Sequence, residues 1–123
     1  VGLGADGILL GVPYYETLHV QDAIKFYRDI ADLFPTLNIV IYHNPENHKF
    51  TIPVAAFKEL VKKPTIIGMK DSHRTTLAFM NLQKIVKSRI SVFVNQTQLY
   101  PYYPKSGSWE HQFPDLVIYS NYL

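Results

Sequence analysis

Residues 65–72 read Thr-Ile-Ile-Gly-Met-Lys-Asp-Ser, an apolar run that ends in a lysine and an aspartate. The run is nearly continuous rather than alternating, which is typical of a strand buried on both faces of a parallel sheet. Similar runs occupy residues 7–12 (Gly-Ile-Leu-Leu-Gly-Val) and 38–42 (Asn-Ile-Val-Ile-Tyr), and a more alternating run occupies residues 90–94. The four runs predict four β-strands.

Helical patterns separate these runs. From residue 20 to residue 31 the apolar side chains fall on one face with a period of 3.6 residues, and Pro35 ends the pattern. A second helix is predicted at about residues 53–62, because a proline suits its first turn and Pro64 forbids its continuation. A third is predicted at about residues 75–87, where apolar residues again share one face.

The strands start about 30 residues apart, which is the length of a βα unit. We therefore predict an α/β fold of order β-α-β-α-β-α-β with right-handed crossovers. Two architectures fit this order: an open doubly wound sheet and part of a (β/α)8 barrel. A full barrel needs about 250 residues, so the 123 residues of this chain would form about half of one.

The C-terminal part breaks the pattern, since residues 99–123 contain five of the nine tyrosines and three prolines. We expect residues 1–104 to form the partial barrel and residues 105–123 to form an irregular tail. Residues 116–119 (Leu-Val-Ile-Tyr) are a candidate short strand within that tail. The chain opens with Val-Gly-Leu-Gly in the middle of the pattern, as expected of a fragment of a longer protein.

Composition excludes several classes of function. The net charge is +2, and the nine Lys and three Arg form no basic run, so we expect no nucleic-acid partner. The absence of cysteine excludes a disulfide framework and suits a reducing compartment, so we expect a cytoplasmic protein. No apolar stretch approaches the roughly 20 residues that span a bilayer, and we expect no membrane partner.

Each predicted strand is followed by hydrogen-bonding side chains. In a parallel βα array the carboxyl ends of the strands share one edge, where functional groups gather. The candidate site residues at the four strand ends are Tyr14 and Tyr15, Tyr42 and Asn44, Lys70, and Asn95. The sequence therefore predicts one site built from all four strand ends.

Lys70 is the candidate nucleophile. Directly after an apolar run its ammonium is expected at a partly desolvated edge, where burial lowers the pKa from about 10.4. A neutral lysine amine attacks ketones and forms Schiff bases. The alternative is that Lys70 points into solvent and pairs with Asp71, because lysine is rarely fully buried.

Tyr42 closes the strand one βα unit before Lys70, and in a barrel such neighbours lie side by side. A phenol both donates and accepts a proton, which carbinolamine formation and dehydration require. The alternative is a core tyrosine whose hydroxyl contacts the backbone. Tyr14 and Tyr15 are candidates for lining a pocket or a subunit contact, and Asn95 for donating a hydrogen bond to a substrate oxygen.

Two further motifs are set aside. Residues 2–7 match Gly-x-Gly-x-x-Gly, but a strand follows where a dinucleotide site needs a helix, so we predict a turn there. This weakens the alternative of an unrelated doubly wound binding domain. His43, Glu46 and His48 resemble metal ligands, but their spacing fits no standard site and we expect no metal. We expect all five histidines at the surface or at the rim of a pocket.

The sequence resembles the pyruvate-dependent class I aldolases of the dihydrodipicolinate synthase and N-acetylneuraminate lyase superfamily. The resemblance covers about residues 2–104. It is carried by residues 4–15, 41–45 and 66–72, whose order and spacing match strands four, five and six of that family's (β/α)8 barrel. Residues 44–50 and 95–101 are more similar to one branch, the trans-o-hydroxybenzylidenepyruvate hydratase-aldolases.

The resemblance implies that Lys70 is the Schiff-base lysine and Tyr42 the proton relay of a lyase. Its substrates would be pyruvate or a substituted 2-oxo acid and an aldehyde, in a full-length family that forms homo-oligomers. No cofactor is implied, because the imine itself is the electron sink. The chain would hold about strands four to seven. Strands one to three and the eighth strand have no counterpart in it, so the alternative is a catalytically inactive fragment of the family.

Overall fold

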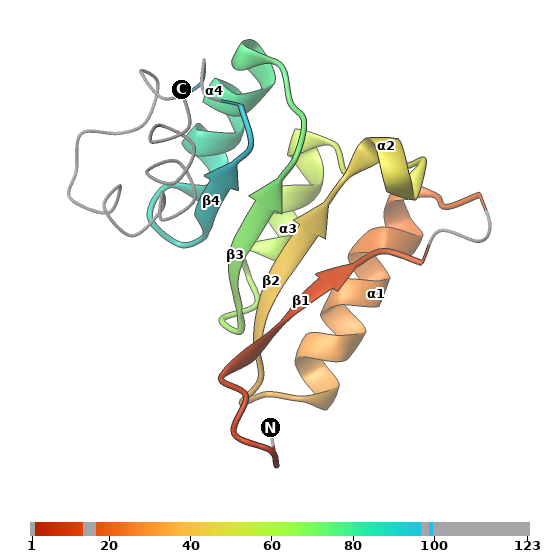
Figure 1. Cartoon of the computed structure of the whole chain (residues 1–123), viewed down its shortest axis with the longest axis vertical. Coiled ribbons are helices and arrows are strands. Elements are labelled where there is room, and N and C mark those ends of the chain that lie inside the picture. Colours follow the sequence, from red (N-terminus) through yellow and green to blue (C-terminus); the bar gives the residue numbers. More distant parts are fainter. Residues whose placement is uncertain (1, 14–16, 97–98, 100–123) are drawn as a thin grey trace, which may run out of the picture.

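The computed structural model describes residues 2–13, 17–96 and 99 (Figure 1). In these ranges strands and helices alternate along the chain. The elements are β1 (Gly7–Gly11), α1 (Val20–Leu33), β2 (Asn38–His43), α2 (Pro45–His48), η1 (Val54–Ala56), α3 (Phe57–Leu60), β3 (Ile66–Asp71), α4 (Thr76–Val86) and β4 (Ser91–Val94). The tail predicted at residues 105–123 lies outside the described residues.

The strands form one parallel sheet in the order β1-β2-β3-β4. Figure 1 shows the chain crossing the sheet in one direction with the helices behind it, as right-handed crossovers require. Along one row of the register Gly11 pairs with Tyr42, and Tyr42 pairs with Lys70. The same row continues from Lys70 to Phe93. This row lies at the carboxyl end of the sheet.

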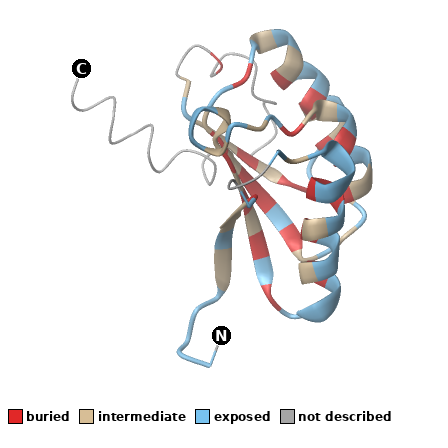
Figure 2. Cartoon of the chain, turned by 90° about the vertical axis from the view of Figure 1, so that its right-hand side faces the viewer, coloured by how far each residue is buried: buried red, intermediate tan, exposed pale blue. Residues whose placement is uncertain are grey.

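One face of the sheet is covered by helices and holds the core (Figure 2). Helices contribute the apolar faces that their periodicity predicted, including Ile24 and Tyr27 of α1 and Leu82 of α4. These side chains belong to the same apolar core cluster as Ile41 and Met69, which are fully buried in β2 and β3. Each such side chain stabilises the fold by about 1.5–3 kcal/mol relative to an exposed position.

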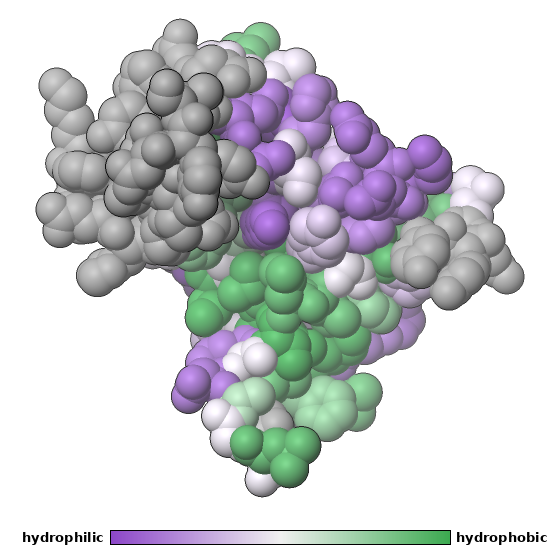
Figure 3. Space-filling view, viewed as in Figure 1, coloured by the Kyte–Doolittle hydropathy of each residue, from purple (hydrophilic) through white to green (hydrophobic). Residues whose placement is uncertain are grey.

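The opposite face of the sheet is open, and apolar side chains gather on it (Figure 3). Leu9 of β1 is 55% exposed there, and its register partner Val40 is only half-buried. In Figure 3 hydrophilic side chains gather beyond this apolar area, toward the carboxyl end of the strands. In a (β/α)8 barrel the face away from the helices is the interior, and function lies at its carboxyl end.

The four predicted strands are confirmed, and so are the helices predicted from residue 20 and from residue 75. The predicted helix at residues 53–62 is instead split into η1 and α3. The short α2 was not predicted. It forms because Pro45 occupies its first turn and the Asn44 side chain accepts a hydrogen bond from the Asn47 N–H. The glycine motif at residues 2–7 forms the predicted turn, in which Gly4 has a φ of 90°.

Candidate functional site

Lys70 and Tyr42 lie side by side on the open face of the sheet. They are register partners on β3 and β2, and Lys70 Nζ lies 5.7 Å from the centroid of the Tyr42 ring. This distance is within the range of a cation–π contact. Both side chains are half-buried. Lys70 lies inside β3 rather than beyond its end, and this strand position holds its amine over the Tyr42 ring.

Asn44 orders the Tyr42 hydroxyl. Its Nδ2 donates a hydrogen bond of 3.0 Å to the Tyr42 hydroxyl oxygen, while its Oδ1 accepts one from the Asn47 N–H at 3.2 Å. The cap of α2 therefore fixes which way the amide points. The Tyr42 hydroxyl accepts this bond, which leaves its own proton available to a ligand.

The alternative for Tyr42, a core tyrosine whose hydroxyl contacts the backbone, describes Tyr27 and not Tyr42. The Tyr27 hydroxyl donates to the Leu10 carbonyl at 3.0 Å on the helix-covered face. Desolvation in this site raises the pKa of Tyr27. Tyr42 contacts a side-chain amide at an open edge, so the two tyrosines differ in both surroundings and partners.

His48 packs against the edge of the site. Its ring meets the Tyr42 ring at an interplanar angle of 89°, with 5.2 Å between the centroids. Gly11 makes room for it, since a Cβ there would lie 2.8 Å from His48 Cε1. Desolvation of the ring is the main cause that lowers the pKa of His48 below 6.5. His48 is therefore mainly neutral at pH 7.

Of the other predicted site residues, the structure describes Asn95 but not Tyr14 or Tyr15. Asn95 follows β4 at the same edge and is exposed, and its backbone N–H donates to the Asp71 carbonyl at 3.2 Å. Tyr14 and Tyr15 lie outside the described residues. The structure thus brings together Lys70, Tyr42 and Asn44 and places Asn95 on an adjoining strand end.

The prediction that all histidines lie at the surface or a pocket rim was wrong for His43, which is 1% exposed. His43 follows Tyr42 and Asp71 follows Lys70, so the alternation of a strand places both on the helix-covered face. There the two side chains approach to 2.6 Å, and Arg74 Nε donates to the second Asp71 oxygen at 2.5 Å. Asp71 is therefore bound to His43 and Arg74 rather than to Lys70.

The other histidines differ in exposure. His19 and His73 are exposed and His48 is half-buried, while His111 lies outside the described residues. In the described part of the chain no three His, Asp or Glu side chains cluster closely enough to hold a metal ion. Within the same residues no helix is both long and apolar enough to cross a membrane.

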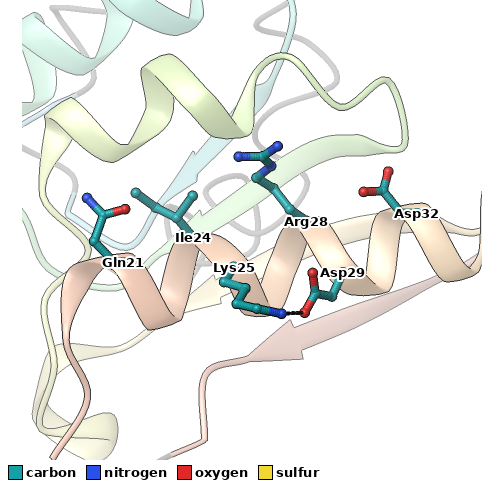
Figure 4. A pocket seen from close by; sticks show the side chains of 6 residues that line it. All are labelled: Gln21, Ile24, Lys25, Arg28, Asp29 and Asp32. Carbon is teal, nitrogen blue, oxygen red and sulfur yellow. Dashed lines mark hydrogen bonds and ion pairs between the residues drawn. The ribbon is translucent and has the colours of Figure 1, made fainter.

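A separate hollow lies along α1 (Figure 4). It is lined by α1 residues alone: Gln21, Ile24, Lys25, Arg28, Asp29 and Asp32. Two of its acidic groups are held in ion pairs, since Lys25 pairs with Asp29 and Asp32 pairs with Lys63. It contains none of the residues at the carboxyl edge of the sheet, and we assign it no role in the chemistry.

A parallel sheet with helices on one face, and with polar side chains at its carboxyl edge, defines part of a (β/α)8 barrel. The sequence model of the Dihydrodipicolinate synthetase family matches residues 2–108. The chain therefore belongs to this family, as the resemblance of its strand motifs predicted.

Known relatives agree with this assignment. The chain is 40% identical over 70 residues to the trans-O-hydroxybenzylidenepyruvate hydratase-aldolase of Pseudomonas aeruginosa, covering 57% of this chain and 21% of the relative. It is 33% identical over 91 residues to the 4-hydroxy-tetrahydrodipicolinate synthase of Prochlorococcus marinus, covering 74% and 30%. The solved structure of PhdJ bound to a substrate intermediate superposes with a TM-score of 0.68 at 30% identity, covering 76% and 29%. The chain thus spans between a fifth and a third of the length of these relatives.

Proposed function

We propose that Lys70 and Tyr42 perform Schiff-base aldolase chemistry of the hydratase-aldolase type on pyruvate or a substituted 2-oxo acid. The observation that carries the proposal is the 5.7 Å approach of Lys70 Nζ to the Tyr42 ring at the carboxyl edge of the sheet. The relatives support it, because one is a hydratase-aldolase and another was solved with a substrate intermediate.

The reaction begins when the neutral amine of Lys70 attacks the ketone carbon of the 2-oxo acid. The carbinolamine oxygen takes up a proton and leaves as water, giving an iminium ion. Tyr42 supplies and removes the protons of this step, since its phenol can both donate and accept. Asn44 holds the phenolic oxygen in place by its hydrogen bond.

The iminium then withdraws electrons from the neighbouring carbon and makes a carbanion there tolerable. A carbon–carbon bond to an aldehyde breaks or forms at that carbon, or water adds to an unsaturated substrate. Hydrolysis of the iminium releases the product and returns the Lys70 amine. The electron sink is the imine, so the proposal needs no metal or organic cofactor.

The remaining predicted residues have binding roles in the proposal. Asn95 donates a hydrogen bond to a substrate oxygen from the adjoining strand end, and we assign Tyr14 and Tyr15 to substrate binding. The second substrate is an aldehyde, and the full-length protein is a homo-oligomer. The absence of cysteine supports a place in the reducing cytoplasm.

The test is reductive trapping. The chain is incubated with pyruvate and borohydride, digested, and mapped by mass spectrometry, and we expect a reduced pyruvate adduct on Lys70. Lys70→Gln abolishes the adduct. Lys62→Gln is the matched control, because it removes an exposed lysine that is paired with Glu59 and leaves the edge intact. A folded sample without an adduct on Lys70, or with equal labelling of Lys62, overturns the proposal.

A further inference from the structure

A buried polar network lies directly behind the candidate site. Its members are His43, Asp71 and Arg74, which are 1%, 0% and 6% exposed. One Asp71 oxygen contacts His43 Nδ1 at 2.6 Å, and the other accepts from Arg74 Nε at 2.5 Å. Both carboxylate oxygens are therefore bound, and the carboxylate cannot turn without losing a charge-assisted hydrogen bond.

The hydrogen bonds also fix the state of the His43 ring. The Ile52 N–H donates to His43 Nε2 at 3.1 Å, so this nitrogen carries a lone pair and no proton. The proton of the neutral ring is then on Nδ1 and is donated to Asp71. The network thus contains a neutral imidazole, an aspartate and an arginine whose charges offset one another.

Among the described residues, the network joins the ends of β2, β3 and β4 to the segment around Ile52. Arg74 Nη2 donates to the Ile52 carbonyl at 3.2 Å, and the Arg74 N–H donates to the Gln96 side chain at 2.8 Å. The backbone reinforces these links, since the Ser72 N–H donates to the His43 carbonyl at 2.9 Å. The ends of β2, β3 and β4 are therefore fixed to one another and to the segment that precedes η1.

We infer that His43, Asp71 and Arg74 are positioning residues that hold Tyr42 and Lys70 in their reacting geometry. The inference rests on the proposed function. Each site residue is the chain neighbour of a network residue, so a movement of His43 or Asp71 moves Tyr42 or Lys70 on the other face. Replacing a buried ionic network by apolar side chains is often neutral for stability. The geometry that the network imposes on Tyr42 and Lys70 therefore explains its position better than a contribution to stability does.

The test compares two variants of similar size at one position. His43→Gln keeps an acceptor for the Ile52 N–H and a donor for Asp71, whereas His43→Leu keeps neither. The measured quantities are the rate of adduct formation on Lys70 at saturating pyruvate and the pyruvate concentration that gives half of that rate. Misplacement by about 1 Å slows an oriented reaction by up to about 100-fold. We expect His43→Leu to lower the rate of adduct formation at saturating pyruvate by about 10- to 100-fold. The pyruvate concentration that gives half of that rate should change little. His43→Gln restores most of the rate.

Val86→Ala controls for a general loss of stability, because Val86 is fully buried in α4 and takes part in none of the hydrogen bonds that join His43, Asp71 and Arg74 to their partners. The inference is overturned if His43→Leu traps pyruvate like the unchanged chain. It is also overturned if Val86→Ala, at an equal loss of stability, slows trapping per folded molecule to the same extent. If His43→Leu does not fold, Arg74→Lys replaces it, because lysine keeps the charge beside Asp71 but lacks the guanidinium fork that also reaches the Ile52 carbonyl.

A readout without substrate separates this inference from the proposed function. Acetylation of Lys70 by acetic anhydride is measured against that of exposed Lys25 in the same molecule between pH 6 and pH 10. We expect His43→Leu to change this ratio and its pH profile, and His43→Gln to restore both. If the unchanged chain forms no pyruvate adduct while the ratio responds in this way, the proposed function fails and the positioning role stands. An unchanged ratio in His43→Leu overturns the positioning role.

Discussion

The substitution Asp71→Asn tests the buried network of His43, Asp71 and Arg74 with a minimal change, because it replaces one carboxylate oxygen with an amide nitrogen. Asp71 is fully buried and accepts from His43 at one oxygen and from Arg74 at the other. An asparagine side chain has a single acceptor oxygen. If that oxygen faces His43, the new amide N–H groups face Arg74 Nε, and two donors oppose each other. The Arg74 side chain, 4% exposed, also loses its counter-charge.

Removing one partner of a buried ion pair costs about 3–5 kcal/mol, because the remaining charge is left desolvated and unpaired. A small domain is stable by only about 5–15 kcal/mol, so this loss is a large fraction of the total. The chain offers a matched control in Glu59→Gln, since Glu59 and Lys62 form an ion pair with the same three-residue spacing. That pair is exposed to water at both ends, and solvent screens it.

The assay is urea unfolding followed by circular dichroism at pH 7. With a urea dependence of about 1–3 kcal/mol per molar, the expected loss lowers the midpoint of Asp71→Asn by about 2 M. We expect Glu59→Gln to unfold at the midpoint of the unchanged chain within experimental scatter. Equal midpoints for the two variants would refute the reasoning, because burial is the main difference between the two pairs.

Three further outcomes follow from the site and the core. Tyr42→Phe keeps the ring over which Lys70 lies but removes the proton relay, and we expect pyruvate trapping to slow by about 100-fold or more. Lys70→Gln in the same assay sets the background. Gly11→Ala places a Cβ 2.8 Å from His48 Cε1 and displaces that ring toward water. We expect the pKa of His48, measured by NMR titration, to rise toward 6.5, and no rise would show that the ring stays in place. Burial raises the pKa of Tyr27, so above about pH 10 unfolded tyrosine ionises first and stability falls as pH rises. We expect Tyr27→Phe to lower the free energy of unfolding by about 1 kcal/mol at pH 7, through loss of the hydrogen bond to the Leu10 carbonyl. In urea unfolding above about pH 10, the stability of this variant should fall less steeply with pH than that of the unchanged chain.

Much of the fold follows from hydrophobic pattern alone. Continuous apolar runs and the 3.6-residue period of residues 20–31 locate the strands and α1 because burial against the sheet dominates their energetics. Short elements obey local chemistry instead. Helix α2 depends on the cap at Asn44 and on Pro45, and four residues are too few to show a period.

The candidate site divides in the same way. Lys70 and Tyr42 could be predicted because each stands at the polar end of an apolar run. His43 could not, since its partner Asp71 lies 28 residues away on the neighbouring strand. Arg74 could not, since the residues it links to Asp71 lie far from it along the chain, His43 being 31 residues away. One signal was available for Asp71 and His43: each follows a candidate site residue directly, and strand alternation sends such a neighbour to the opposite face.

Because side chains alternate between the two faces of a strand, the proposed site depends on the register of β2 against β3. In the observed register Tyr42 pairs with Lys70 and His43 pairs with Asp71. A slip of β3 by one residue would turn Lys70 toward the helix-covered core and Asp71 toward the open face. Lys70 would then be an unpaired buried charge, and Arg74 would lose its counter-charge. The polar network behind the sheet therefore selects the single register that places the amine over the phenol ring.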